Sequence, residues 1–165
     1  KADFNASSSE TNCITIYTGA LDTLINNDDA LALLIGHELA HSILGHSARQ
    51  HALISKLNYF LKLSLLNPRN VSYVTAKNKL LYEMRKMEYT ADVEGAKLAL
   101  KAGYDLSDAK ETLNILNTFG NYIDWSSTHP SPEKRIENFE EKTKKDLTRW
   151  SGCGIMSKSP LRRRH

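Results

Sequence analysis

The chain has few cysteines and no long hydrophobic run, and these two absences exclude several classes of protein. Cys13 and Cys153 are its two cysteines among 165 residues, too few for a disulfide framework or a zinc site built from cysteines. They could form a disulfide with each other or both stay free. No uninterrupted apolar stretch of about 20 residues occurs, so we expect no segment of this sequence to span a membrane.

The rest of the composition is that of an ordinary globular domain. Apolar residues make up 41% and charged residues 25% of the chain, so one folded core is expected rather than disorder. The net charge of +3 is uneven: residues 1–133 carry 12 basic and 15 acidic side chains, whereas residues 134–165 carry 10 and 4. We interpret this basic end as a solvated tail rather than a contact for anionic lipid or nucleic acid, and we expect no nucleic-acid partner.

The most informative segment is His37-Glu38-Leu39-Ala40-His41, which lies in an apolar stretch with helical character. Residues four apart share one face of a helix, so His37 and His41 can bind the same tetrahedral zinc ion. Glu38 is offset around the helix, beside an open coordination position, where its carboxylate can take a proton from water. The alternative is a core histidine beside a solvent-facing Glu38, but a buried helix rarely holds these groups without a charge partner. The pattern therefore indicates a zinc-dependent hydrolase with one Zn²⁺ per chain.

The sequence also suggests the bounds of this helix. Asn26, Asn27, Asp28 and Asp29 provide a cap and negative charge for a helix from about residue 28 to beyond Ser47. Its apolar residues surround the axis, so we expect it to be buried. In one continuous helix His46 lies about 180° from His37 and points away from the metal, so the third ligand comes from elsewhere.

A second carboxylate pair lies on a long helix predicted from Val74 to Ala102 and ended by Gly103. Glu88 and Asp92 are four residues apart. This spacing suits a third metal ligand followed by a carboxylate that accepts the other ring N–H of a ligating histidine. The small residues Ala96 and Ala99 favour close packing against another helix.

Residues 50–66 continue in helical register with apolar residues mostly on one face. Lys56 and Lys62 interrupt the run and exclude a membrane-spanning segment. The alternatives are a core helix or an element that rests on a membrane or packs on a partner. Its apolar face consists of Leu53, Ile54, Leu57, Phe60, Leu61 and Leu65.

Shorter elements are predicted before and after this helical region. We expect a loop-like lead-in over residues 1–12 and then a strand over residues 13–18, either structural or available to pair with an extended substrate. A helix from Asp105 or Ser107 to about Phe119 is followed by a loop. The predicted domain is 13–150, and the basic tail is 151–165.

The last predicted helix begins at Ser131-Pro132 and reaches about Trp150. Pro130 restricts His129 to extended geometry, so the loop presents this imidazole in a defined way. Arg135 follows in the first turns and could stabilise an oxyanion. Either residue could instead be an ordinary surface polar group.

Taken together, these motifs resemble one family of zinc peptidases. The chain is similar to the family of the CAAX prenyl proteases, a bacterial periplasmic assembly protease and the mitochondrial Oma-type endopeptidases. The similarity rests on His37–His41 with Leu44-Gly45-His46, then Glu88 and Asp92, then His129-Pro130 with Arg135-Ile136. The Oma-type enzymes are the most similar, on Tyr17-Thr18-Gly19, Leu34–Glu38, Trp125–Pro130 and a tail that bears Cys153.

The resemblance implies a mostly helical α+β, zincin-like metallopeptidase domain with a small sheet or hairpin beside the metal helix. It implies zinc ligands His37, His41 and Glu88, the general base Glu38, and Asp92 behind the ligands. It also implies that His129 lies at the metal or oxyanion side of the site and that Arg135 lies near it.

It also implies a protein or peptide substrate, a homo-oligomer as one arrangement, and a location at the mitochondrial inner membrane facing the intermembrane space, with the bacterial periplasm as the alternative. A membrane surface or anchor would lie outside this chain, whose start at Lys1 suggests a processed form or an excised domain. A non-catalytic or autoinhibited adaptor, with the His129 loop plugging the metal site, is the competing interpretation. Asn5–Ser9 departs from the family pattern, so the substrate-binding edge is expected to differ.

Overall fold

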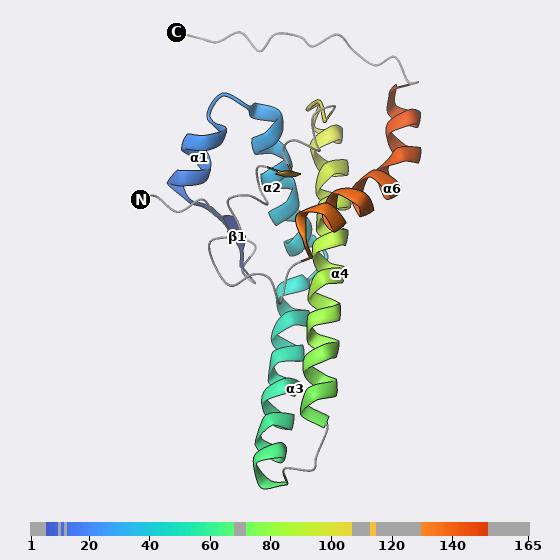
Figure 1. Ribbon diagram of the computed structural model, residues 1–165. Helices are drawn as coiled ribbons and strands as arrows, with labels where there is room; N and C mark the ends of the chain where they lie inside the picture. Colours follow the sequence, from blue (N-terminus) through green and yellow to red (C-terminus); the bar gives the residue numbers. More distant parts are fainter. Residues whose placement is uncertain are drawn as a thin grey trace.

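Helices make up most of the fold, with a small two-stranded sheet at the N-terminal side (Figure 1). The computed structural model describes residues 6–9, 11, 13–67, 72–106, 113–114 and 130–151. The strands β1 (Ala6–Ser8) and β2 (Ile14–Ile16) are antiparallel, with Ser7 opposite Thr15. The helices are α1 (Thr18–Leu24), α2 (Asp28–Ile43), α3 (His46–Leu66), α4 (Ser72–Lys101) and α6 (Pro132–Ser151). The predicted mostly helical fold with a small sheet is confirmed.

The pairing of α2 with α4 forms the centre of the molecule. Gly36 and Gly95 face each other there, and a Cβ built on Gly36 would lie 2.4 Å from the Gly95 carbonyl oxygen. Two glycines therefore let the two backbones touch, as small residues do wherever helices pack closely. Beside this contact, the main hydrophobic core joins α2, α4 and α6 through Leu33, Ala96, Ala99, Leu106, Leu113, Ile136 and Phe139.

Several predicted helix ends are confirmed by their caps. The Asn27 side chain accepts a hydrogen bond from the Ala30 N–H at 2.9 Å and begins α2. The helix α4 ends at Lys101, and Gly103 follows with φ of 90°, a conformation that glycine adopts without strain. Ser131 precedes α6, where its hydroxyl accepts from the Lys134 N–H.

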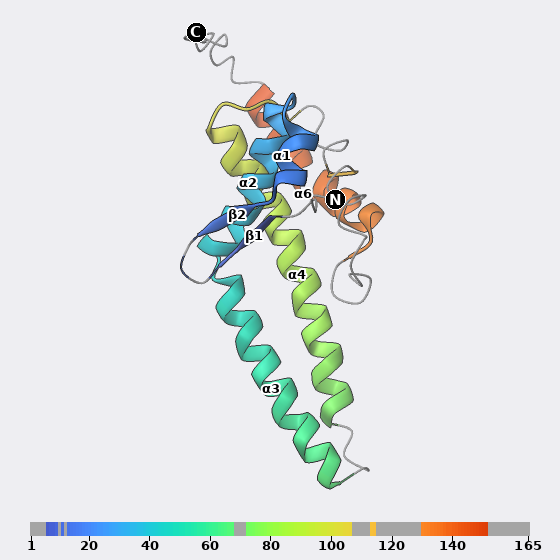
Figure 2. The same ribbon diagram turned by 90° about the vertical axis from the view of Figure 1, so that its left-hand side faces the viewer.

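Helices α3 and α4 run side by side and extend beyond the rest of the molecule as a long hairpin (Figures 1 and 2). We call residues 50–67 and 72–82 the α3–α4 hairpin. At its base, Arg49 Nη2 lies 2.6 Å from Glu83 Oε2. Among the described residues, no helix has the length and apolarity needed to cross a bilayer.

Four predictions about local structure were wrong. The metal helix does not continue past Ser47, because Gly45 adopts a left-handed φ of 65° and separates α2 from α3. The predicted strand over residues 13–18 ends at Ile16, since Thr18 and Gly19 already belong to α1. The predicted loop-like lead-in contains β1, which gains its hydrogen bonds by pairing with β2.

The fourth prediction, complete burial of α2, was wrong for one side of the helix. Ile35, Leu39 and Ile43 are exposed there, and Ile35 and Leu39 line an open pocket with Leu98 and Ala102 of the α4 end. An all-round apolar pattern does not reveal which side of a helix lacks a neighbour. Several predicted features lie outside the described residues. They are the loop with His129, most of the helix that was predicted to reach Phe119, Cys153, and the basic tail.

Candidate metal centre

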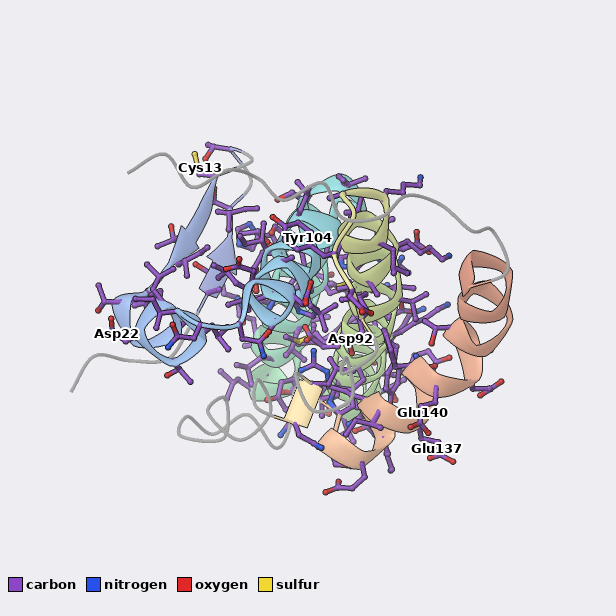
Figure 3. The ribbon with its side chains drawn as sticks, turned by 90° about the horizontal axis from the view of Figure 1, so that it is seen from above. Cys13, Asp22, Asp92, Tyr104, Glu137 and Glu140 are labelled. Atoms are coloured by element: carbon purple, nitrogen blue, oxygen red, sulfur yellow. The ribbon has the colours of Figure 1, made fainter. Side chains whose placement is uncertain are left out.

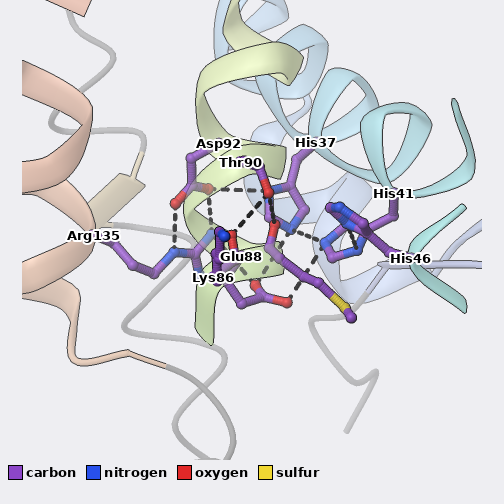
Figure 4. Close-up of polar contacts among 9 residues, drawn as sticks. His37, His41, His46, Lys86, Glu88, Thr90, Asp92 and Arg135 are labelled. Atoms are coloured by element: carbon purple, nitrogen blue, oxygen red, sulfur yellow. Dashed lines mark hydrogen bonds and ion pairs between the residues drawn. The ribbon is translucent and has the colours of Figure 1, made fainter. Parts of the chain in front are cut away.

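His37 and His41 of α2 and Glu88 of α4 converge on one point (Figure 4). The two histidine Nε2 atoms lie 3.1 Å apart. The Glu88 carboxylate oxygens lie 3.6 Å from His37 Nε2 and 3.5 Å from His41 Nε2. These three side chains therefore present three ligand atoms to one another, as the spacing of both motifs predicts.

The spacing of the three ligand atoms fits a divalent metal. Nitrogen and oxygen ligands about 2.0–2.1 Å from a tetrahedral ion lie about 3.3 Å from one another, close to the separations found here. The two Nε2 atoms face each other across the same space, where a metal cation bound through their lone pairs would hold both rings neutral. His37 and Glu88 are buried, so these polar groups need a partner within the protein, and a bound cation would provide one.

The charges of the two histidines are set by their surroundings. Burial lowers the pKa of His41 to about 4, and neighbouring His37 contributes further, so the ring is neutral and can donate its Nε2 lone pair. Burial also lowers the pKa of His37, but the hydrogen bond and charge of Asp92, with Glu88, outweigh it and raise the pKa overall. A cation at the ligand point would compete with that proton.

Asp92 lies behind His37, one turn after Glu88 on α4. Its Oδ1 is 3.0 Å from His37 Nδ1, the geometry that leaves Nε2 free for a metal. Asp92 lies in the interior of the molecule in Figure 3, where Asp22, Glu137 and Glu140 lie at the periphery. The structure thus brings the predicted second carboxylate to the predicted histidine.

Arg135 of α6 binds the other side of Asp92 through two hydrogen bonds. Its Nε lies 2.8 Å from Asp92 Oδ2 and its Nη2 lies 2.5 Å from Asp92 Oδ1. Burial raises the pKa of the Asp92 carboxyl, but the Arg135 guanidinium outweighs burial and lowers the pKa overall, so Asp92 stays ionised. Arg135 Nη2 also lies 4.0 Å from Glu88 Oε2. Its guanidinium is therefore engaged behind the ligands, and oxyanion stabilisation by Arg135 stays a prediction.

His46 lies behind His41, where the sequence did not predict it. The prediction that His46 points away from the metal was wrong, because the left-handed Gly45 turns the chain and returns His46 to the site. Its Nδ1 lies 3.1 Å from His41 Nδ1, and the rings meet edge to face at 4.9 Å between centroids. The signal that could have found it is Gly45 itself, a typical helix-ending glycine.

We expect His46→Phe to weaken metal binding. A His41 ring that ligates through Nε2 carries its proton on Nδ1 and can donate it to His46 Nδ1; phenylalanine keeps a ring there but removes the acceptor. Loss of such a partner costs about 10–100-fold in metal affinity. Titration with Co²⁺, followed by visible absorption, measures the change, and His51→Phe on the exposed side of α3 is the matched control. Equal affinities of the two variants would contradict this role.

Glu38 lies in a groove beside the three ligands. The groove is between β1, α2, α3 and α4, and Ser8 of β1 forms hydrogen bonds with Glu38 that lower its pKa. Burial has the larger effect and raises the pKa of Glu38 overall, which makes its carboxylate a better proton acceptor. The groove is lined by Ala6, Ser7, Ser8, His37, Glu38, His41, Ser47, Gln50, Met84, Met87 and Glu88.

Two helix-borne histidines with an intervening glutamate, and a glutamate from a second helix, define a metal centre of the metallopeptidase type. Residues 3–143 match the model of Peptidase family M48, and the chain belongs to this family. Members of this family are metal-dependent.

Curated relatives confirm the predicted resemblance to the Oma-type enzymes. The mitochondrial metalloendopeptidase OMA1 of Schizosaccharomyces pombe is 31% identical over 136 residues, which cover 78% of this chain and 40% of the relative. OMA1 of Arabidopsis thaliana is 35% identical over 129 residues, covering 74% and 26%. Human OMA1 is 30% identical over 142 residues, covering 74% and 27%. The chain thus spans less than half the length of each of these relatives. No solved structure matches the chain significantly.

Proposed function

We propose that this chain is the catalytic part of a zinc-dependent endopeptidase that cleaves proteins in mitochondria. The observation that carries the proposal is the convergence of His37, His41 and Glu88 beside the buried carboxylate of Glu38. Metal binding alone does not need Glu38. Its place in the groove therefore favours an enzyme over a zinc-stabilised adaptor.

The chemistry divides between the metal and the chain's own residues. A zinc ion held by the three ligands would act as a Lewis acid, polarising the peptide carbonyl and making water more acidic. Glu38 takes a proton from the attacking water, and a C–O bond forms at the carbonyl carbon. Glu38 then delivers the proton to the peptide nitrogen as the C–N bond breaks, which releases an acid and an amine.

The groove suggests how a substrate is held, in a zincin-like arrangement. β1 forms one wall beside Glu38 and lines the groove through Ala6, Ser7 and Ser8. An extended peptide lying in the groove would run along this wall and past Glu38. Met84 and Met87 form an apolar part of the opposite wall and suit an apolar substrate side chain. His129 stays a proposed oxyanion ligand or plug, outside the described residues.

The names of the relatives support a mitochondrial location and nothing more specific. We propose a location at the inner membrane with the site facing the intermembrane space. A homo-oligomer and an anchoring region beyond this chain are part of the same proposal. A bacterial periplasmic location has no support among these relatives.

The test is metal analysis together with proteolysis of an unfolded protein such as casein. We expect about one zinc per chain and cleavage that stops with 1,10-phenanthroline and returns when Zn²⁺ is restored. His41→Ala is expected to lose both zinc and cleavage, because two ligands hold the ion far less tightly than three. Zinc bound at full occupancy without any cleavage would favour the adaptor. Cleavage that resists the chelator would contradict the proposed mechanism.

A further inference from the structure

The far end of the α3–α4 hairpin carries exposed leucines that no part of the described chain covers. Leu65 and Leu66, in the last turn of α3, are 76% and 84% exposed. Val74, in the first turns of α4, is 57% exposed. By contrast Leu57, Phe60 and other residues that face α4 are half-buried. The leucines therefore contribute little to packing of the hairpin, and their exposure is unfavourable in water.

The charge of the hairpin has one sign. Residues 50–82 contain five Lys or Arg side chains and no Asp or Glu. Lys62 lies one turn before the exposed leucines, whereas Lys77 and Lys79 of α4 lie further from that end, on the turns beside Leu53 to Phe60 of α3; all three lysines are exposed. The first acidic residue after this segment, Glu83, is already paired with Arg49 at the hairpin base. Exposed leucines at the end of a hairpin whose charged residues are all basic match an anionic lipid bilayer, which offers negative charge at its surface and apolar chains beneath.

We propose that the end of the hairpin docks on an anionic membrane surface, with Leu65 and Leu66 inserted among the lipids and Lys62 and Lys77 among the headgroups. The hairpin extends beyond the rest of the molecule, so a flat surface can reach its end without meeting the body (Figures 1 and 2). Neither helix has the length and apolarity needed to span the bilayer, so contact at the surface is the arrangement proposed. A protein partner suits these features less well, because it would have to supply both an apolar pocket and a ring of acidic residues.

Docking by its end would also set the height of the metal centre above the bilayer. The 21 residues of α3 rise about 30 Å from His46 to Leu66. An extended substrate needs about nine residues to span that distance. The docked enzyme would therefore cleave membrane-bound substrates outside the lipid, some distance from the surface.

Flotation of the purified chain with vesicles tests the docking. We expect binding to vesicles of phosphatidylcholine with cardiolipin, weak binding to phosphatidylcholine alone, and loss of binding at high salt. The double variant Leu65→Ser, Leu66→Ser and the double variant Lys62→Gln, Lys77→Gln are each expected to bind at least about tenfold more weakly, since each lysine near a membrane contributes about fivefold. All four side chains are exposed, so the fold is not at risk.

Matched controls distinguish binding through the hairpin from nonspecific adsorption of exposed apolar residues. They also distinguish it from binding through the basic tail, which every variant keeps. Ile25→Ser with Ile43→Ser changes two apolar residues of the body that are 69% and 63% exposed. Lys101→Gln with Lys134→Gln removes two exposed charges outside the hairpin. Both controls are expected to bind as the unchanged chain does.

The proposal is overturned if the unchanged chain does not bind anionic vesicles, or if the hairpin variants bind them as strongly as the unchanged chain does. It is also overturned if the leucines instead hold two copies together, seen as a dimer that Leu65→Ser, Leu66→Ser converts to a monomer without any vesicle binding. Vesicle binding is measured on Glu38→Gln as well. Failure of the docking and failure of the proposed peptidase activity are therefore distinguishable.

Discussion

Glu38→Gln is expected to reduce peptide cleavage by about 10²–10⁴-fold while the chain keeps its metal and its fold. Glutamine has the same shape as glutamate but cannot take a proton from water at neutral pH. His37, His41 and Glu88 are untouched, so zinc content and zinc affinity are expected to stay the same. Rates are measured on a quenched fluorescent peptide or on casein, with zinc determined on the same samples.

The stability of this variant gives a second, independent readout. Burial raises the pKa of the Glu38 carboxyl in the folded metal-free chain, so its ionisation above that pKa costs folding free energy. Glutamine carries no charge there, and the melting temperature of the metal-free variant at neutral pH is expected to equal or exceed that of the unchanged chain. At low pH, where Glu38 is protonated in both folded and unfolded states, the difference is expected to vanish.

Glu94→Gln is the matched control, because it makes the same chemical change on the outer face of α4. Glu94 Oε1 lies 2.8 Å from Lys97 Nζ, and both side chains are substantially exposed, so its loss is expected to change little. If Glu38→Gln cleaves at the rate of Glu94→Gln, Glu38 is not the general base. If it loses its zinc, the fall in rate says nothing about proton transfer, and the proposed division of roles is wrong.

The parts of the site that the sequence predicted are those set by the period of one helix. His37 and His41 share a face because they are four residues apart, and Glu88 and Asp92 share another for the same reason. The sequence also indicated that these faces meet, since a helix with small residues beside two carboxylates needs a close neighbour. The helix ends at Asn27 and Gly103 follow from side-chain and backbone chemistry within one turn.

The parts that the sequence did not predict depend on contacts between distant residues. Arg135 and Asp92 are 43 residues apart, and no local pattern indicates that they pair. β1 has the small polar residues of a loop and becomes a strand because β2 lies beside it. His46 was misplaced for a different reason: the apolar pattern continues through Gly45, and one left-handed residue changes where the next helix points.

The mutual contact of Gly36 and Gly95 sets how closely the metal ligands approach, so Gly36→Ala is expected to damage both stability and metal binding. A Cβ on Gly36 would meet the Gly95 carbonyl oxygen at 2.4 Å, and a Cβ on Gly95 would meet the His37 nitrogen at 2.6 Å. The obstacles are backbone atoms, which cannot rotate away as a side chain can. The two helices must therefore separate, and Glu88 of α4 moves away from His37 and His41 of α2.

The sign of the stability change makes this a sharp test. In a helix with open space around it, glycine to alanine stabilises by about 1 kcal/mol, because alanine favours the helical conformation. Here the clash is expected to reverse that gain and cost about 1–3 kcal/mol or more, as overpacking does. For a chain of this size the melting temperature would fall by about 3–10 °C. Zinc affinity is expected to fall at least about tenfold, since ligand positions matter within about 0.5 Å.

Gly103→Ala distinguishes a displaced site from a merely destabilised chain. Gly103 has φ of 90° with nothing within 4 Å of a built Cβ, so alanine there costs backbone strain of about 1–2 kcal/mol but creates no clash. It is expected to lower the melting temperature and leave zinc affinity unchanged, whereas Gly36→Ala lowers both. A Gly36→Ala chain that melts no lower than the unchanged protein and binds zinc equally well would show that the helices do not touch at these glycines. The arrangement of His37, His41 and Glu88 would then need another explanation.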